Sequence, residues 1–377
     1  MCDRPTVGLC AIVKNEEENL PRCLASVQGW VDELVVVDTG SDRTVAIAEG
    51  YGARIGHFAW CDDFAAARNA SLALATQDWV LVLDADEVLV VRDEGWRDRL
   101  GVLPATIWAC ALDLFNVGAE RGVGGTYLRL FRNRPELRFV GTFHETIAYQ
   151  GQPLPETAVA DFLDVLAIAH DGYTPAALAR KNSERNIPLL EKQRAAGSLD
   201  LYLLYALAEA YAADNRPEAA QSCYEEAWSR LEPHLLEGTP PADGRAVPSW
   251  LHNLGMAALA AEDWDTLMAI VSQGNGWYPD FPPLLHLAGV TAAALGFPLG
   301  AVPYFERCLQ LGENGGFYRR EPFRVEWMTV RAAYNLGCAY QALGDKSAAQ
   351  QAFARALAWD VHFQPARDRL MELGETV

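Results

Sequence analysis

The feature that most constrains the fold of this 377-residue chain is a change of pattern near His170. Before that residue, short apolar runs alternate with segments of helical spacing, which predicts an α/β domain with a mostly parallel sheet. After it, nearly every segment has the spacing of an amphipathic helix. Because a single hydrophobic core rarely serves a chain of this length, we expect two domains of different classes.

Three apolar runs in the first half are short enough to be buried strands, and helical segments separate them. We expect the strands at residues 7–13, 34–37 and 79–83, and the helices at 20–27, 44–49 and 63–75. From residue 106 to 147 the pattern changes to strands and glycine-rich loops. Within this region, Gly118 to Gly125 is either a flexible acceptor loop around Arg121 or a plain hairpin connection.

The helices of the second half repeat with a period of about 34 residues, which is typical of tetratricopeptide units. Small and large residues recur at fixed positions, and the small ones allow neighbouring helices to cross closely. One such unit cannot bury its apolar face alone, so the units are expected to stack. The alternative is an unrelated helical bundle. The clearest unit has Leu336, Gly337, Tyr340, Ala349, Phe353 and Ala356, and earlier units begin at Leu207-Ala208, Leu254-Gly255 and Ala288-Gly289.

These patterns together set the expected domain boundaries. We predict an α/β domain over residues 1–175, a helical linker over 176–199 and an all-α tetratricopeptide-repeat domain over 200–377.

Composition excludes some classes of function. The chain has 31 basic and 50 acidic residues and a formal charge of -19, so a nucleic-acid backbone would be repelled. No apolar run approaches the roughly 20 residues that cross a bilayer, and the N-terminus lacks the pattern of a secretory signal peptide. The eight cysteines contain no CxxC pair, which favours a reducing compartment. We therefore expect a cytoplasmic protein with no transmembrane segment.

The sharpest motif is Asp84-Ala85-Asp86, directly after the third apolar run. Ligands of open α/β sheets bind outside the carboxyl ends of the strands. Two carboxylates at alternate positions there suit a hard divalent cation, which prefers oxygen ligands and keeps water and phosphate oxygens around it. The alternative is a solvated turn, because carboxylates are common after strands.

Two further residues are expected to face the same crevice. Asp38 ends the second apolar run, where the first two parallel strands would open a cleft. Arg68 lies on a helix that leads back to the Asp84 strand and could meet a diphosphate or a base. Taken singly, Asp38 could cap a helix and Arg68 could be a surface ion-pair partner.

A second constellation is Phe139-Val140-Gly141-Thr142-Phe143-His144-Glu145. A neutral imidazole is a common metal ligand and a carboxylate is a common base. A zinc-protease HExxH motif would need histidine at 148, where the chain has Ala148. Alternatively, His144 only forms a hydrogen bond at a strand end. The chain also lacks a GxGxxG loop after its first strand, a P-loop and a GxSxG elbow.

Several segments resemble the family 2 glycosyltransferases, in particular the branch of lipopolysaccharide-core β-glucosyltransferases and the bacteriocin peptide S-glycosyltransferase. The resemblance reaches about residue 195, and members of this branch with a tetratricopeptide tail exist. Asp171 departs from the branch, where an aromatic residue is common. The matching segments are residues 11–16, 37–44, 63–69 and 84–87, Phe139-x-Gly141-x-x-His144-Glu145, His170-x-Gly172-Tyr173 and residues 181–186.

The resemblance implies a GT-A fold, a UDP-sugar donor, Mg²⁺ or Mn²⁺, and inversion at the anomeric carbon. It implies that Asp86 and Asp84 bind the metal, with Asp84 toward the ribose and His144 as a further metal or phosphate contact. Asp86 and Glu145 would be the catalytic residues, with Glu145 as the base. The implied donor-binding residues are Val13, Asn15, Glu16, Asp38, Arg68, Asp84 and Ala85.

The prediction from sequence is therefore a metal-dependent hexosyltransferase that acts on a hydroxyl or thiol of a glycan, glycolipid or peptide. The repeats would bind a polypeptide acceptor or another protein, or would dimerise the chain. The alternative function is a repeat scaffold that binds a partner protein and carries a vestigial glycosyltransferase domain.

Overall fold

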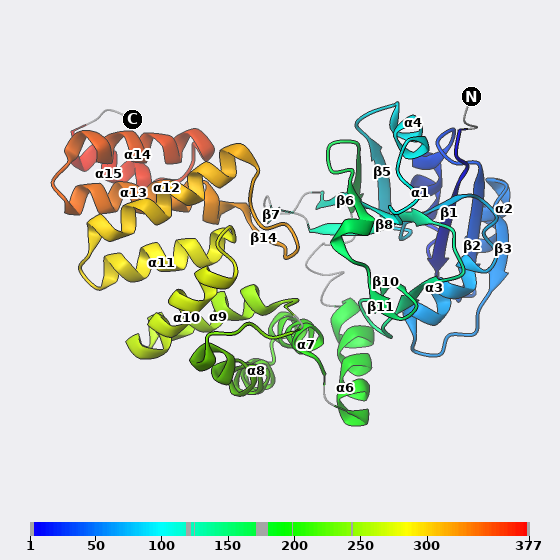
Figure 1. Ribbon diagram of the computed structural model, residues 1–377, viewed down its shortest axis with the longest axis horizontal. Coiled ribbons are helices and arrows are strands. Elements are labelled where there is room, and N and C mark those ends of the chain that lie inside the picture. The colour runs from blue at the N-terminus through cyan, green and yellow to red at the C-terminus, as the bar shows by residue number, and fades with distance from the viewer. Residues whose placement is uncertain are drawn as a thin grey trace. The chain divides into compact units, whose positions relative to one another are not determined.

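The computed structural model describes residues 4–117, 122–123, 125–170, 180–197, 199–242 and 244–374. Two compact units make up the chain. The first contains Met1–Ala119 and Gly124–Ala196, and the second contains Glu120–Val123 and Gly197–Val377. The first unit is α/β and the second is helical (Figure 1), which confirms the predicted succession of fold classes.

The first unit is built on a nine-stranded mixed sheet. Its strand order is β3-β2-β1-β4-β8-β6-β13-β5, and β12 pairs with β6. The first four strands in this order are parallel, β8 and β5 run against their neighbours, and β6 and β13 are parallel to each other. The strands are β1 (Val7–Val13), β2 (Glu33–Asp38), β3 (Arg54–His57), β4 (Trp79–Val82), β5 (Glu87–Val91), β6 (Ala109–Asn116), β8 (Thr126–Arg132), β12 (Val159–Asp161) and β13 (Leu166–His170).

Both faces of this sheet are covered, because the buried strands are apolar on both sides. On one face, Leu9 and Leu81 pack with α1 (Leu20–Val27) and α4 (Trp96–Gly101) in one hydrophobic cluster. On the other face, residues of α3 (Phe64–Leu72) form a second cluster with the intervening positions of β1 and β4. Helix α2 (Thr44–Gly50) follows β2. The strands and helices predicted for residues 7–83 are present with small shifts at their ends.

A three-stranded antiparallel sheet lies beside α3 and carries the second constellation. It contains β9 (Leu137–Val140), β10 (Thr146–Tyr149) and β11 (Gln152–Pro153), and its residues join the cluster on the α3 face. The β9–β10 connection holds His144 and Glu145. This sheet fixes the connection against α3, since Asn69 exchanges two hydrogen bonds of 2.9 Å with the backbone of Phe139.

The segment that precedes the repeats also packs on the first unit. It comprises a π-helical turn, Asn182–Asn186, and α6 (Ile187–Ala196). The predictions for Gly118 to Arg121, for Asp171, Gly172 and Tyr173, and for the start of the linker lie outside the described residues.

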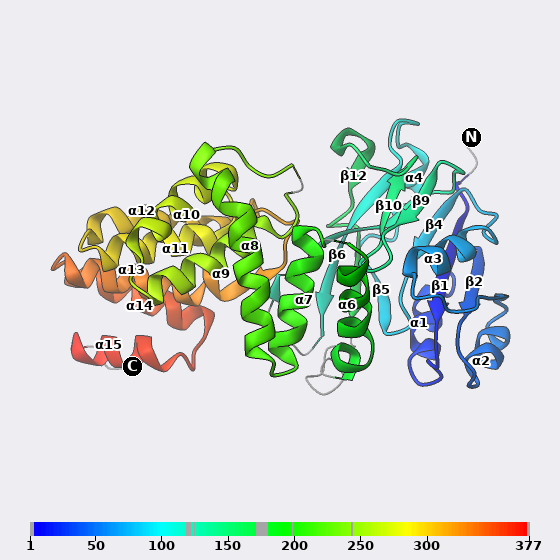
Figure 2. The ribbon, with the colours of Figure 1, turned by 90° about the horizontal axis from the view of Figure 1, so that it is seen from below.

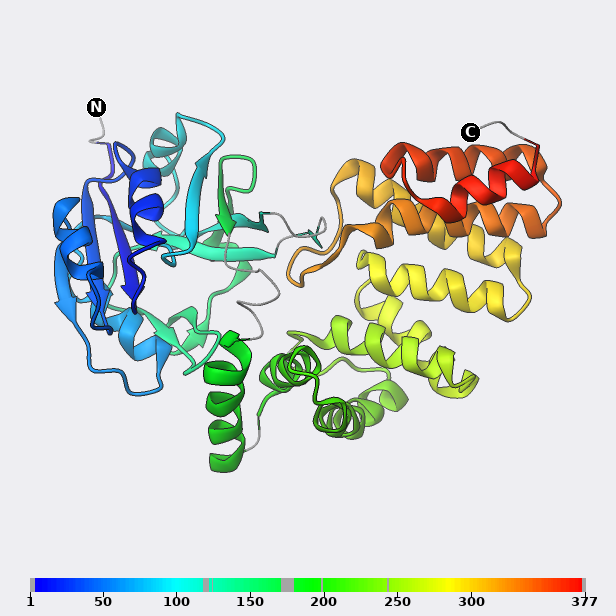
Figure 3. The ribbon, with the colours of Figure 1, turned by 180° about the vertical axis from the view of Figure 1, so that it is seen from behind.

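The second unit consists of helical hairpins, as the repeat pattern predicts. The pairs α7–α8, α9–α10, α11–α12 and α13–α14 pack within each hairpin, and α15 packs on α14. Figure 2 shows α7 and α8 side by side, and Figure 3 shows the last helices in red and orange. A two-stranded sheet pairs β7 (Gly122–Val123) with β14 (Phe323–Arg324). The helices are α7 (Leu201–Ala213), α8 (Pro217–Glu237), α9 (Val247–Ala260), α10 (Trp264–Trp277), α11 (Pro282–Ala294), α12 (Pro298–Asn314), α13 (Val330–Ala342), α14 (Lys346–Trp359) and α15 (Gln364–Glu372).

The small-against-large packing predicted for the repeats is present. A Cβ atom added at Gly337 would lie 2.5 Å from the ring of Phe353, and one added at Gly289 would lie 2.6 Å from the ring of Phe305. These two glycines therefore let each aromatic ring contact the backbone of the paired helix. No helix among the described residues has the length and apolar character needed to cross a membrane.

Candidate functional site

The ends of three neighbouring parallel strands meet at one edge of the sheet. Val13 ends β1 and pairs with Asp38, which ends β2. On the other side of β1, Cys10 pairs with Val82 at the end of β4. Since neighbouring strands lie about 4.8 Å apart, β2 and β4 are about 10 Å from each other across β1. Strand order and register therefore bring Asp38 and the Asp84–Asp86 segment to the same edge.

The loops that follow β1 and β2 are tied to each other. Asn15 has a φ of 57° and accepts a 2.9 Å hydrogen bond from the backbone of Ser41. The backbone N–H of Glu16 donates to Oγ1 of Thr44 at 2.8 Å. A Cβ atom at Gly40 would lie 2.6 Å from Oδ1 of Asn15, so a glycine is needed for this close approach. The two loops form one rigid rim of the site.

The rim also carries negative charge. Asp38 is 7% exposed and accepts a 3.1 Å hydrogen bond from the backbone of Gly40. The pKa of Glu16 is raised, mainly by burial and further by the charge of Asp86. A hydrogen bond from Asn19 acts in the opposite direction. Glu16 and Asp86 are therefore within electrostatic reach of each other.

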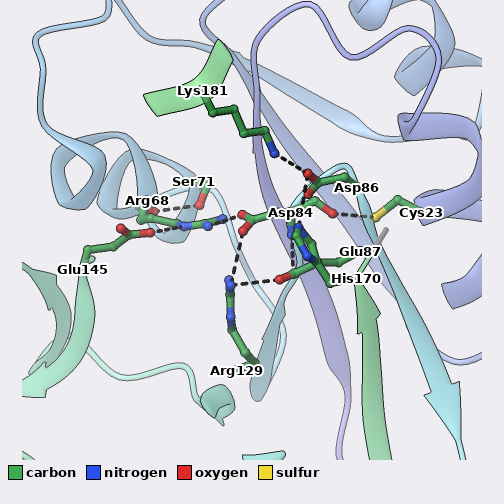
Figure 4. A network of polar contacts seen from close by, with 10 residues as sticks. All are labelled: Cys23, Arg68, Ser71, Asp84, Asp86, Glu87, Arg129, Glu145, His170 and Lys181. Atoms are coloured by element: carbon green, nitrogen blue, oxygen red, sulfur yellow. Dashed lines mark hydrogen bonds and ion pairs between the residues drawn. The ribbon is translucent and has the colours of Figure 1, made fainter. Parts of the chain in front are cut away.

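At the centre of the site, Asp84 is held between two guanidinium groups (Figure 4). Nη2 of Arg68 donates to Oδ1 of Asp84, and Nη2 of Arg129 donates to Oδ2 at 3.2 Å. The side chain of Arg68 is 3% exposed. Burial acts to raise the pKa of Asp84, but the two guanidinium groups outweigh it and lower the pKa. Asp84 is thus an ionised group whose two oxygens both have cationic partners.

Two glutamates extend this ion-pair chain at its ends. Oε1 of Glu145 accepts from Nε of Arg68 at 2.9 Å. Oε1 of Glu87 accepts from Arg129 at 3.1 Å, and its Oε2 accepts from the backbone of Asp84 at 2.7 Å. Carboxylates and guanidinium groups therefore alternate from the β9–β10 connection to the start of β5. Alternation of this kind is what allows charges to be buried.

Asp86 has a different set of partners. Its Oδ2 accepts a 2.8 Å hydrogen bond from Nζ of Lys181 and lies 3.3 Å from Nε2 of His170. Nδ1 of His170 is 3.0 Å from Oδ1 of Asn116. Burial acts to raise the pKa of Asp86, but the hydrogen bonds and charges of His170 and Lys181 lower it to about 2. Asp86 is therefore a carboxylate at neutral pH, with its contacts concentrated on one oxygen.

The remaining predicted residues take different positions. Ala85 is 4% exposed and lies in the turn between Asp84 and Asp86. His144 is exposed, has a φ of 51°, and its ring contacts that of Phe143 at 4.4 Å. The structure thus brings Arg68, Asp84 and Glu145 into direct contact, whereas the imidazole beside Asp86 belongs to His170.

Sequence reasoning did not assign site roles to four residues that the structure places here. Arg129 is a charged residue between Leu128 and Leu130 in a strand, which is a usable signal of a buried partner. The other three were visible only as parts of longer motifs: Glu87, His170 and Lys181. Nothing in their spacing indicated which side chain each would contact, because the side-chain contacts of Glu87, His170 and Lys181 join segments far apart in the chain.

The described residues contain no group of three or more His, Cys, Asp and Glu side chains arranged to hold a metal ion. What the site does offer is one carboxylate oxygen and one imidazole nitrogen facing each other, on Asp86 and His170.

Comparison with known families finds one match in each unit. Residues 9–91 match glycosyl transferase family 2, and residues 330–360 match the tetratricopeptide repeat. These matches confirm the two resemblances predicted from the sequence.

Individual proteins are similar to parts of the chain. A TPR repeat-containing protein of Synechococcus elongatus is 51% identical over 144 residues, which is 37% of this chain and 35% of the relative. The SPbeta prophage-derived glycosyltransferase SunS of Bacillus subtilis is 30% identical over 203 residues, 50% of this chain and 45% of the relative. An uncharacterized glycosyltransferase of Rickettsia felis is 42% identical over 79 residues, 21% of this chain and 28% of the relative. The chain thus spans less than half the length of each relative.

Proposed function

From a family 2 glycosyltransferase domain joined to tetratricopeptide repeats, we propose that this protein is an inverting, metal-dependent glycosyltransferase. It would transfer a sugar from a UDP-sugar to a hydroxyl or thiol of a glycan, glycolipid or peptide. The cytoplasm is the proposed compartment.

The observation that carries the proposal is the pair formed by Asp86 and His170 at the carboxyl edge of the sheet. Their facing atoms are 3.3 Å apart. Adjacent ligands of an octahedral Mg²⁺ ion, each about 2.1 Å from the metal, lie about 3 Å apart. One carboxylate and one imidazole also suit Mn²⁺. The donor set and its spacing therefore fit a divalent cation.

Such an ion would obtain its remaining ligands from water and from the diphosphate of the donor, as Mg²⁺ commonly does. When bound, it would neutralise the charge of the departing nucleotide, which can lower the barrier by several kcal/mol. Asp84 and His144 stay proposed contacts at the same site. For Asp84 to become a ligand, one of its bonds to Arg68 or Arg129 would have to open.

The rim formed by the first two strand ends is the proposed nucleotide-binding surface. Asp38 is buried at a strand end and supplies a carboxylate to a uridine or ribose hydroxyl. Val13, Asn15, Glu16 and Ala85 are the other proposed donor-binding residues. The sequence predicts that Arg68 contacts the donor, and its bonds to Asp84 and Glu145 support a role in holding those carboxylates in place.

Glu145 is the proposed catalytic base. Arg68 holds one of its oxygens at 2.9 Å, which orients the carboxylate. In the proposed step, Glu145 accepts the proton of the acceptor hydroxyl or thiol. The acceptor atom then forms a bond to the anomeric carbon while the bond from that carbon to the UDP oxygen breaks. The electron pair of the broken bond leaves with UDP, and attack from the opposite side inverts the configuration.

Calorimetric titration of UDP in the presence and absence of Mn²⁺ tests this proposal. Wild type is expected to bind UDP more tightly with Mn²⁺, and Asp86→Asn is expected to weaken that binding at least about tenfold. Asp113→Asn is the matched control, because Asp113 also pairs with a basic side chain, that of Arg92 at 2.7 Å, but lies on β6 outside the site. A panel of UDP-sugars, assayed for Mn²⁺-dependent release of UDP, would then identify the donor.

The same titration separates the enzyme from the alternative function. A scaffold with a vestigial domain would give no heat with millimolar UDP and Mn²⁺. That result would overturn the proposal.

A further inference from the structure

The ammonium group of Lys181 occupies a position that a divalent cation would need. Its Nζ donates to Oδ2 of Asp86 at 2.8 Å, and the same oxygen faces His170 at 3.3 Å. Figure 4 shows Lys181 reaching Asp86 from outside the Arg68–Asp84–Arg129 chain. The side chain of Lys181 is 33% exposed, whereas that of Asp86 is 13% exposed. Lys181 therefore covers the more accessible side of a mostly buried carboxylate.

The segment that carries Lys181 is held on the first unit by two further contacts. The guanidinium of Arg185 lies 5.3 Å from the centre of the Phe64 ring. Farther along, Nζ of Lys192 bonds to Oδ2 of Asp62 at 2.5 Å. Between Lys181 and α6 the backbone forms a π-helical turn, a distortion that is frequent at functional sites. The backbone is thus anchored, while the long side chain of Lys181 can change its direction.

A divalent ion and this ammonium group would compete for the same oxygen. An ion about 2.1 Å from Oδ2 would lie within about 5 Å of an ammonium group placed 2.8 Å from the same atom, with only that oxygen between the two cations. Like charges at such a separation repel, all the more where water is partly excluded. Lys181 therefore opposes an ion seated between Oδ2 of Asp86 and His170 until its side chain turns away.

A diphosphate gives the displaced lysine a new partner. The lysine side chain is a flexible stem with a compact charge and three donors, and it is a common phosphate-binding group. A diphosphate bound to a metal at Asp86 would place phosphate oxygens close to the backbone of Lys181, within reach of its side chain.

We propose that Lys181 is an exchangeable counter-ion of the donor site, which pairs with Asp86 in the absence of nucleotide and with the donor diphosphate when a divalent cation binds Asp86. This inference rests on the proposed function. It assigns Lys181 as a positioning residue that couples the two binding events. Because of Lys181, the metal binds weakly alone and more tightly when UDP is present. By thermodynamic linkage, the metal raises the affinity for UDP by the same factor.

A titration with Mn²⁺ tests the inference without any assay of activity. The electron paramagnetic resonance signal of the free ion measures how much Mn²⁺ is bound. The variant Lys181→Met keeps an unbranched side chain that is one atom shorter and removes its charge. Without UDP, it is expected to bind Mn²⁺ about tenfold more tightly than wild type, because no ammonium competes for Asp86. With Mn²⁺ present, its affinity for UDP is expected to be several-fold lower than that of wild type.

The control variant is Lys346→Met, which removes an exposed lysine from the helical unit. Its Mn²⁺ and UDP affinities are expected to equal those of wild type. If wild type shows Mn²⁺-dependent UDP binding and Lys181→Met binds Mn²⁺ no more tightly, the counter-ion role is wrong and the proposed function stands. If wild type binds no UDP with Mn²⁺, both fail together.

Discussion

The two units bury titratable side chains in different ways. In the α/β unit, carboxylates at the centre of the site pair with guanidinium groups, as in the chain from Glu145 through Arg68 to Asp84. In the helical unit, two imidazoles are buried beside an aromatic ring. His286 is 4% exposed and contacts Trp327 at 4.8 Å between ring centres, and His252 contacts the same indole at 5.1 Å.

The imidazole of His286 is held in its neutral form. Burial, with the nearby charge of Arg331, lowers its pKa to about 3. Its Nε2 is 2.8 Å from Nδ2 of Asn335, so the unprotonated nitrogen accepts this hydrogen bond. Burial likewise lowers the pKa of His252. The repeats therefore hold these two imidazoles without charge, by packing and single hydrogen bonds.

The difference indicates where a charged ligand can enter. Arg68, Arg129 and Lys181 come from three separate segments and meet carboxylates at a sheet edge, where a cation or a phosphate can exchange with an existing partner. A charged ligand cannot replace a partner of the two imidazoles in this way, because a charge introduced among aromatic rings would lose its hydration. The paired charges at the sheet edge are thus suited to binding a charged ligand, whereas the neutral imidazoles of the repeats serve packing.

The largest expected effect is the loss of Arg68. Arg68→Met removes the guanidinium group from Glu145, whose side chain is 13% exposed, and from Asp84, whose side chain is 38% exposed and keeps Arg129. The cost is expected at the lower end of the about 3–5 kcal/mol typical of breaking a fully buried pair. Denaturant unfolding measures the loss in the free energy of unfolding, and hydrogen exchange assigns this loss to the α/β unit. Arg4→Met is the control, since Arg4 pairs with Asp98 at the exposed surface at 3.6 Å and should cost under about 1 kcal/mol. Equal costs for the two variants would mean that the buried chain contributes no more than a surface pair.

The next effect is a pH dependence of the helical unit. The pKa of His286 falls from 6.5 to about 3 on folding. Between these two pH values the imidazole is therefore protonated in the unfolded chain and neutral in the folded chain. The contribution of His286 to the free energy of unfolding is complete above pH 6.5. It decreases by up to about 1.4 kcal/mol per pH unit as the pH falls from 6.5 toward 3. Relative to His286→Gln, wild type should lose about 2 kcal/mol between about pH 6.5 and about pH 4.5, measured by urea unfolding.

The control for this titration is His362→Gln, because His362 is exposed on the same unit. Its stability difference from wild type should stay constant over the same pH range. A constant difference for His286→Gln as well would show that the imidazole is protonated in the folded repeats.

The smallest effect concerns packing between the helices of one repeat. Gly337→Ala would press a methyl group against Phe353, where the added Cβ lies 2.5 Å from the ring. Overpacking costs about 1–3 kcal/mol, and the better helix propensity of alanine returns up to about 1 kcal/mol, so a net loss of about 1 kcal/mol is expected in hydrogen exchange of α13 and α14. Gly300→Ala, whose added Cβ would have no neighbour closer than 3.7 Å, should instead stabilise α12 slightly. A stabilised Gly337→Ala would contradict the close-packing argument.

The sequence by itself determined the two classes of architecture and the identity of several residues at the sheet edge. Periodicity, strand ends and small-large repeats are local properties, so the amino-acid pattern alone places Asp38, Asp84 and Asp86 at strand ends and Gly337 in the same repeat unit as Phe353. Each of these inferences needs only neighbouring residues and the regular geometry of a strand or a helix.

Only the tertiary structure decided which groups these carboxylates meet. Lys181 and Asp86 are 95 residues apart, and Arg68 and Glu145 are 77 residues apart. Such contacts depend on strand order and register and on how the segment 180–196 lies on the first unit, and no local pattern specifies these. A carboxylate after a strand can be read from spacing, whereas its partner depends on the whole sheet, because charge pairing acts through space between segments that only folding brings together.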